Sequence, residues 1–217
     1  MDMVEFWTLC STNNISIEKE SIEIFERYSK ELKYWNEKVN LISRKDEDNI
    51  LDRHILHSLA ICKYNDFRPK EWVLDIGTGG GLPGIPVKIA NPEIRIDLID
   101  SIAKKAKITN MLADHTGLRN IEVFNDRVEE FLARSNKKYD TIIARAVTRT
   151  INILDWSSKY VKSGGRYLLL KGGDLDEEIE EAKKKYKKLT FKLIDINFLG
   201  YNYFSEQEKK LLIIKGF

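Results

Sequence analysis

Two acidic residues at the ends of apolar runs flank a glycine-rich segment. Asp75 lies in the apolar run 72–76, which leads directly into Gly77-Thr-Gly-Gly-Gly-Leu-Pro-Gly84. Asp100 directly follows a second apolar run, residues 94–99. Glycine tolerates positive φ and lets a ligand approach the backbone closely. A glycine turn between a strand and a helix is a common nucleotide site. We therefore expect a nucleotide-like ligand at this turn.

The residue types in and around this turn favour one ligand over another. A strict dinucleotide fingerprint, G-x-G-x-x-G, would need a third glycine where this chain has Leu82. A carboxylate at Asp75 would repel a pyrophosphate, whereas it suits the positively charged amino acid part of S-adenosylmethionine. Asp100 could accept both hydroxyls of an adenosine ribose, which fits S-adenosylmethionine and NAD equally well. The segment thus favours S-adenosylmethionine, and a glycine turn with no ligand is the plain alternative.

The elements around these residues change character along the chain. Residues 1–68 have apolar side chains at helical spacing, including Phe25, Leu32 and Trp35. Residues 69–217 alternate short apolar runs with helical segments, which predicts a mostly parallel sheet covered on both faces. The expected strands are residues 72–76, 94–99, 121–124, 141–144, 167–170, 191–199 and 210–217. The last two could form a hairpin, so one strand should be antiparallel. We predict a Rossmann-like α/β fold of the class I methyltransferase type, with seven strands and a helical N-terminal region, packed as one compact unit.

Composition limits the other classes of protein. The formal net charge is only +2, so RNA binding would need a local basic patch. Two cysteines without ligand spacing, Cys10 and Cys62, fit a reducing compartment. No apolar run reaches the ~20 residues of a membrane helix, and no leader pattern opens the chain. We expect a cytoplasmic protein without a membrane contact, and nothing indicates an obligate protein partner.

Several segments, taken in order, resemble the bacterial glucose-inhibited division protein B family. Members of that family resemble small-subunit ribosomal RNA guanine-N7 methyltransferases. The most specific segment is Gly-Leu-Pro-Gly-Ile-Pro, residues 81–86. The others are residues 40–41, 53–58, 100–101 with 104–105, 125–129, 145–146 and 171–172. The resemblance covers nearly the whole chain and implies S-adenosylmethionine as methyl donor and 16S ribosomal RNA of the small ribosomal subunit as substrate.

The resemblance also implies roles for single residues. Gly77 and Leu82 would contact the cofactor through the loop, and Thr78 and Gly79 lie between them. Arg145 would lie by the cofactor carboxylate and the site of methyl transfer. The chain departs from the family at His57, where an aspartate is usual, and at Asp100, where glutamate is frequent. The second change keeps the carboxylate, whereas the first removes a charge and puts the role of His57 in doubt.

Two further residues are expected at the adenine side of the cofactor. Val128 and Glu129 follow the third expected strand, where the loop of this architecture borders the adenine. Val128 could pack on the ring and Glu129 could orient it. Taken alone, the same segment reads as an ordinary charged helix start.

Basic residues and one histidine are the candidates for RNA contact. Arg145 and Lys171 follow or end strands, where doubly wound sheets build sites, although each could equally form a salt bridge. Lys104 and Lys105 lie near a helix start, where positive charge opposes the helix dipole and would suit phosphates better. His54 shares a helix face with His57, but no third ligand completes a metal site, and a core or substrate-side role is expected.

The mechanism expected for a guanine N7 acceptor needs no general base, because N7 carries a lone pair and no proton. No single proton-transferring catalytic residue is therefore predicted. The alternatives are a small-molecule or protein methyltransferase, an NAD-dependent oxidoreductase and a non-catalytic RNA-binding module. The last leaves the aligned acids and glycines unexplained.

Overall fold

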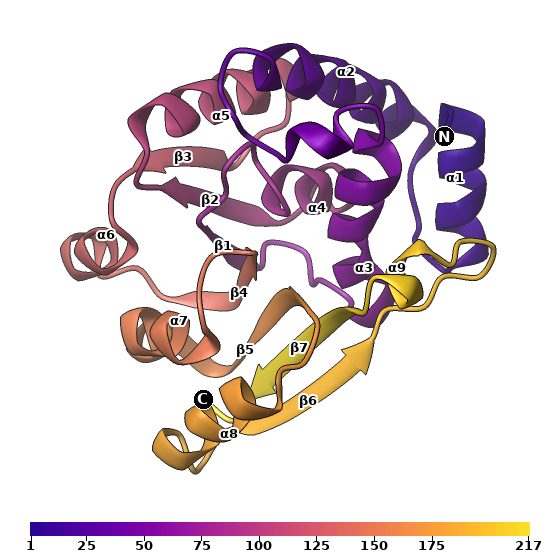
Figure 1. Cartoon of the computed structure of the whole chain (residues 1–217). Helices are drawn as coiled ribbons and strands as arrows, with labels where there is room; N and C mark the ends of the chain where they lie inside the picture. Colours follow the sequence, from indigo (N-terminus) through magenta and orange to yellow (C-terminus); the bar gives the residue numbers. More distant parts are fainter.

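A seven-stranded sheet forms the centre of the structure, a computed structural model that describes residues 1–217 (Figure 1). The strand order is β3-β2-β1-β4-β5-β7-β6, and only β7 runs antiparallel to its neighbours. The strands are β1 Trp72–Ile76, β2 Arg95–Asp100, β3 Ile121–Asn125, β4 Tyr139–Arg145, β5 Val161–Gly172, β6 Thr190–Asp195 and β7 Lys209–Lys215. The fold class expected from the sequence is confirmed.

The central strands are buried on both faces, as their nearly continuous apolar runs predict. In β1, Val73 packs into one hydrophobic cluster and Leu74 and Ile76 into another. The two clusters lie on opposite faces, because successive side chains of a strand point in opposite directions. Helices must therefore cover both faces of the sheet.

Helices α1 to α5 cover one face and α6 to α8 the other (Figure 1). The helices are α1 Met3–Thr12, α2 Lys19–Asn36, α3 His57–Tyr64, α4 Gly84–Ala90, α5 Ala103–Thr116, α6 Val128–Ser135, α7 Thr150–Ser157, α8 Asp176–Lys185 and α9 Tyr203–Glu206. The short helical segments are η1 Arg44–Asp46, η2 Ile50–Leu56 and η3 Ser158–Tyr160. Segment η2 is a π-helix that continues directly into α3.

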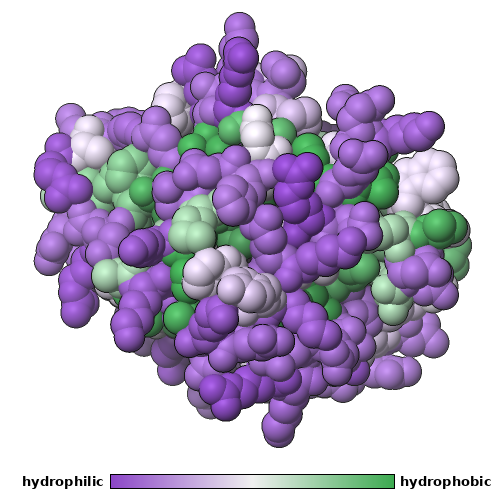
Figure 2. All heavy atoms as spheres, turned by 90° about the horizontal axis from the view of Figure 1, so that it is seen from above, coloured by the Kyte–Doolittle hydropathy of each residue, from purple (hydrophilic) through white to green (hydrophobic).

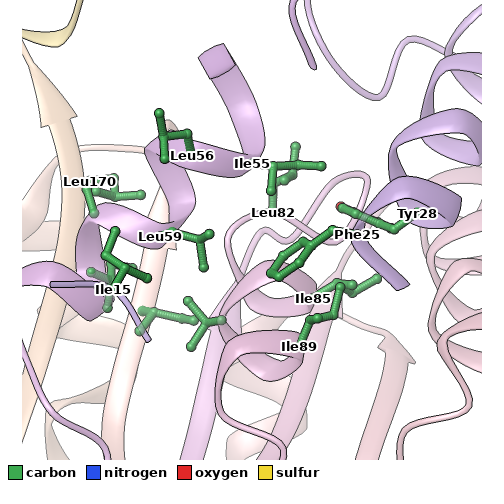
Figure 3. Close-up of a cluster of buried hydrophobic side chains, with 14 of the residues drawn as sticks. Ile15, Phe25, Tyr28, Ile55, Leu56, Leu59, Leu82, Ile85, Ile89 and Leu170 are labelled. Atoms are coloured by element: carbon green, nitrogen blue, oxygen red, sulfur yellow. The ribbon is translucent and has the colours of Figure 1, made fainter. Parts of the chain in front are cut away.

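The N-terminal helices pack against the glycine segment that follows β1. The hydroxyl of Tyr28 in α2 donates a 2.8 Å hydrogen bond to the carbonyl of Gly80. Phe25, Tyr28, Ile55 and Leu82 belong to one buried cluster, shown in Figure 3. The N-terminal region therefore helps to hold the loop in place.

Polar side chains dominate the face of the molecule seen in Figure 2, with apolar residues showing in smaller groups between them. No helix of the structure combines the length and the apolar character needed to cross a membrane.

Candidate functional site

The carboxyl ends of β1 and β2 meet at the glycine segment. In the parallel pairing Ile76 lies beside Ile99, so Asp100 follows immediately. The N–H groups of Gly77 and Thr78 donate to the carbonyl of Ile99 at 2.8 and 3.0 Å. The loop is therefore fixed against the end of the neighbouring strand, where sites form in doubly wound sheets.

The carboxylate of Asp100 connects the two strand ends. Its Oδ2 accepts from the N–H of Gly79 at 2.9 Å, and its Oδ1 accepts from the N–H of Ile102 at 2.8 Å. Each carboxylate oxygen has a second lone pair, so the pair of oxygens can still accept from two ligand hydroxyls. This geometry is compatible with the ribose contact expected from the sequence.

A first cavity of ≈ 300 Å³ opens beside Asp100. Four residues predicted to contact the cofactor line it together: Gly77, Asp100, Val128 and Glu129. The sequence analysis missed Val147 and Trp156, which add apolar walls. The acidic side chains of this cavity suit the hydroxyls of a ribose, and its apolar walls suit an adenine ring, so the lining is compatible with an adenosine group.

Gly77 has a position that only glycine fits without rearrangement. Its φ is +67°, and a Cβ there would lie 2.6 Å from Cγ2 of Val147. Val147 follows β4 and lines the same cavity, so the backbone of Gly77 forms part of the wall. Glycine at this position therefore lets the backbone approach Val147 closely.

Asp75 lies near the end of β1, as predicted, but its carboxylate is enclosed by the protein. The side chain is completely buried, and Oδ2 accepts from Thr78 Oγ1 at 2.6 Å and from the N–H of Gly84 at 2.9 Å. Its Oδ1 is buried without a hydrogen-bond partner. Asp75 therefore holds the loop in place through Thr78 and Gly84. It has no exposed oxygen for the ion pair with a cofactor ammonium group that the sequence suggested.

Burial gives Asp75 a testable pH dependence. Desolvation raises the pKa of this carboxyl to about 7 from an ordinary 3.8, although hydrogen bonds from Thr78 and Gly84 oppose the rise. Between these values the folded protein holds a proton that the unfolded chain has lost. The stabilisation that this proton contributes is fully present below the pKa of Asp75 in the unfolded chain. It is lost as the pH rises through the pKa of Asp75 in the folded protein.

We expect Asp75→Asn to remove this pH dependence. The difference between the two free energies of unfolding, original protein minus variant, should decrease as the pH rises from about 5 to about 8. Urea titrations across this range measure the difference, in which other titrating groups such as His54 largely cancel. A difference that stays constant with pH would contradict the assignment.

Leu82 and Thr78 use their side chains within the protein. Leu82 is buried in the hydrophobic cluster beside Ile55 (Figure 3). Thr78 donates to Asp75, as described above. The side chains of these two residues therefore shape the loop.

Arg145 and His54 meet although 91 residues separate them. Arg145 ends β4, and its Nη2 lies 2.6 Å from Nδ1 of His54, while Nη1 donates to the carbonyl of His54 at 3.3 Å. Burial and the charge of Arg145 lower the pKa of His54 to about 3. The imidazole is therefore neutral near pH 7.

A second cavity of ≈ 370 Å³ lies at this pair of residues. Arg145 and Ala146 line it, and the next residue, Val147, lines the first cavity. The chain directly after β4 therefore borders both cavities. His57, which departs from the family pattern, also lines the second cavity and packs on Phe204 with ring centroids 5.3 Å apart.

The predicted basic residues are only partly brought together. Lys171 donates to Glu178 Oε1 at 2.6 Å and to the carbonyl of Thr148 at 2.7 Å. The ammonium group of Lys171 is therefore in a salt bridge, the alternative that the sequence also allowed. Its bond to Thr148 holds the chain after β4 in place. Lys104 is exposed, and Lys105 is half-buried at the rim of the first cavity.

Two residues of the second cavity carried no signal in the sequence. Asp46 ends η1, and Tyr203 begins α9 near the other end of the chain. The guanidinium of Arg53 lies over the ring of Tyr203, 4.7 Å from its centroid, and pairs with Asp46 at 2.7 Å. No spacing relates residues 46, 53 and 203, so only the fold brings them together.

The chain matches the sequence model of the GidB family, described as rRNA small subunit methyltransferase G, over residues 21–210. Ribosomal RNA small subunit methyltransferase G of Chlorobium phaeobacteroides is 41% identical over 180 residues, which cover 83% of this chain and 80% of that protein. The protein of the same name from Christiangramia forsetii is 39% identical over 204 residues, 90% of each chain.

Solved structures with low sequence identity share the fold. TrmN from Thermus thermophilus superposes with a TM-score of 0.58 and 17% identity, covering 77% of this chain and 53% of that one. A putative rRNA methylase from Clostridium thermocellum gives a TM-score of 0.56 and 15% identity, covering 75% and 96%.

Proposed function

The chain belongs to the GidB family of rRNA small subunit methyltransferase G proteins, and from this premise we propose that it methylates N7 of a guanine in 16S ribosomal RNA. The methyl donor is S-adenosylmethionine, whose sulfonium supplies an already activated methyl group. The observation that carries the proposal is the pair of adjacent cavities on either side of the chain after β4. One has the chemistry for adenosine, and the other is large enough for a base.

The first cavity is our proposed cofactor site. Asp100 would accept the ribose hydroxyls, Val128 would pack on the adenine and Glu129 would orient it. The backbone of Gly77 and Gly79 would approach the ligand, while Thr78, Leu82 and Asp75 hold the loop in shape. The apolar walls from Val147 and Trp156 support a partly desolvated adenine.

The protein's task in this reaction is positioning. Guanine N7 has no proton to remove, so no side chain has to act as a general base. Arg145 and His54 would hold the base in line with the methyl group and exclude water, and such positioning contributes up to about 7–11 kcal/mol in favourable cases. The transfer rate should therefore follow no bell-shaped pH profile from an enzyme group.

The RNA-facing surface is proposed to include the start of α5. Lys105 lies at the rim of the cofactor cavity, and Lys104 is the exposed residue beside it. Phosphates of a bound RNA would offset the unfavourable position of both lysines at the helix start. The small ribosomal subunit is the proposed partner, and a cytoplasmic location follows from that substrate.

Replacing both lysines with glutamate tests the surface. The double variant Lys104→Glu with Lys105→Glu should weaken RNA binding and flatten its dependence on salt. Each lost phosphate contact lowers the slope of log K against log salt by about 0.7–0.9. Binding assays at several salt concentrations measure this slope. An unchanged slope would place the RNA elsewhere.

The proposed reaction is tested by mapping methylation in ribosomal RNA by mass spectrometry, with and without the protein. The expected result is a 7-methylguanine that appears only with the protein. Transfer to a small molecule or a protein, with no RNA modified, would favour the alternative methyltransferase function.

A further inference from the structure

The second cavity contains buried polar atoms that the protein itself leaves without partners. His54 and His57 are 7% and 6% exposed, and Nε2 of each ring has no hydrogen-bond partner. Both residues line the cavity. Buried polar groups in folded proteins are nearly always hydrogen-bonded, so unpartnered ones on residues that line a cavity point to a ligand.

The contact with Arg145 determines what His54 presents to this cavity. A guanidinium has only donors, so Nδ1 of His54, 2.6 Å away, must accept. The proton of the neutral ring is therefore on Nε2. His54 therefore carries an unpartnered N–H donor in the wall of the second cavity, and Arg145 fixes that tautomer.

Asp46 places an acceptor next to this donor. Its Oδ1 accepts from Arg53 Nη1 at 2.7 Å, whereas its Oδ2 is 3.8 Å from Nε2 of His54. That distance is too long for a hydrogen bond between the two side chains. A donor and a charged acceptor thus lie side by side, and each can bind a third group.

We propose that His54 and Asp46 together recognise the target base as guanine. The inference rests on the function proposed above. The O6 atom of guanine would accept from Nε2 of His54, and N1–H with the 2-amino group would donate to Oδ2 of Asp46. Adenine presents a donor where guanine has O6 and an acceptor at N1, so the same two side chains would oppose it.

This arrangement also agrees with the site of methyl transfer. On the guanine ring O6 lies next to N7, and His54 is the residue that contacts Arg145 at the border of the two cavities. A base held through O6 therefore has N7 next to the atom that His54 contacts. Arg145 is a positioning residue here, because it acts through His54.

The test compares uridine hexamers that carry one guanine, one inosine or one adenine. Their binding is measured with saturating S-adenosylhomocysteine, by fluorescence anisotropy. The protein should prefer guanine over adenine by about tenfold or more, as a bidentate base contact provides. Inosine, which lacks the 2-amino group, should fall between them.

Asp46→Asn should reduce the preference for guanine over adenine by about tenfold. The matched control is Asp48→Asn, which removes the same charge from an exposed residue two positions away that pairs with Lys33. The control should keep the preference. Equal binding of all three hexamers, or an unchanged preference in a folded Asp46→Asn protein, would overturn the proposal.

A second measurement keeps the proposal testable if the variant does not fold. In ¹⁵N spectra of the original protein, His54 should show the proton on Nε2, and the guanine hexamer should shift that signal. His115, exposed and paired with Glu31 at 2.7 Å, serves as the internal reference. A proton on Nδ1, or no shift with guanine, would contradict the inference. Methylation of ribosomal RNA by the same preparation separates this failure from failure of the proposed function.

Discussion

Arg145→Ala is expected to lower the single-turnover rate of methyl transfer by about 100-fold, the effect expected of a misplacement of about 1 Å at a reacting centre. The substitution removes the two donors that hold His54, at 2.6 and 3.3 Å. It also removes a side chain from the wall of the second cavity. The base would then be held loosely, although N7 itself stays reactive.

The measurement is the transfer of a labelled methyl group to unmodified small-subunit RNA, together with thermal unfolding. Arg149→Ala is the matched control, because Arg149 is exposed and pairs with Glu181 at 2.6 Å. The control should transfer at the original rate. Full activity of a folded Arg145→Ala protein would remove Arg145 from the site.

Asp100→Ala is expected to weaken the binding of S-adenosylmethionine by about 100-fold or more. Two hydrogen bonds to a charged group contribute about 1.5–3 kcal/mol each, and 1.4 kcal/mol is a factor of ten. The substitution also leaves the N–H groups of Gly79 and Ile102 without their acceptor. The loop would therefore lose its link to the end of β2.

Two conservative variants separate these effects, and calorimetric titration with S-adenosylmethionine measures all three. Asp100→Glu keeps the carboxylate and should retain most of the affinity. Asp100→Asn should bind poorly, because its NH2 group would face the N–H of either Gly79 or Ile102, each of which donates to Asp100. Tight binding by Asp100→Ala would show that the ribose is held elsewhere.

Local sequence patterns predicted the sheet and several residues of the first cavity. The strand 72–76 begins and ends where the structure has β1, and the antiparallel strand near the C-terminus is β7. Gly77, Asp100, Val128 and Glu129 were predicted separately and line one cavity. This worked because each lies at the carboxyl end of a parallel strand or directly after it, and parallel strands bring those ends to one edge.

The sequence could not show what each charged group would meet. Lys171 looked free for RNA, but it pairs with Glu178 of α8, and Asp75 looked open to the cofactor, but the loop closes over it. Such partners come from other elements, so spacing along the chain carries no record of them.

The sequence by itself determined the fold class, the glycine loop and its acids, because these depend on apolar periodicity and on residues close together in the chain. Only the tertiary structure decided the second cavity. Asp46 and His54 come from the N-terminal helices, Arg145 from β4 and Tyr203 from the C-terminal segment. Their shared wall exists because the N-terminal helices pack over the end of the sheet, and that packing brings together residues that no local rule connects.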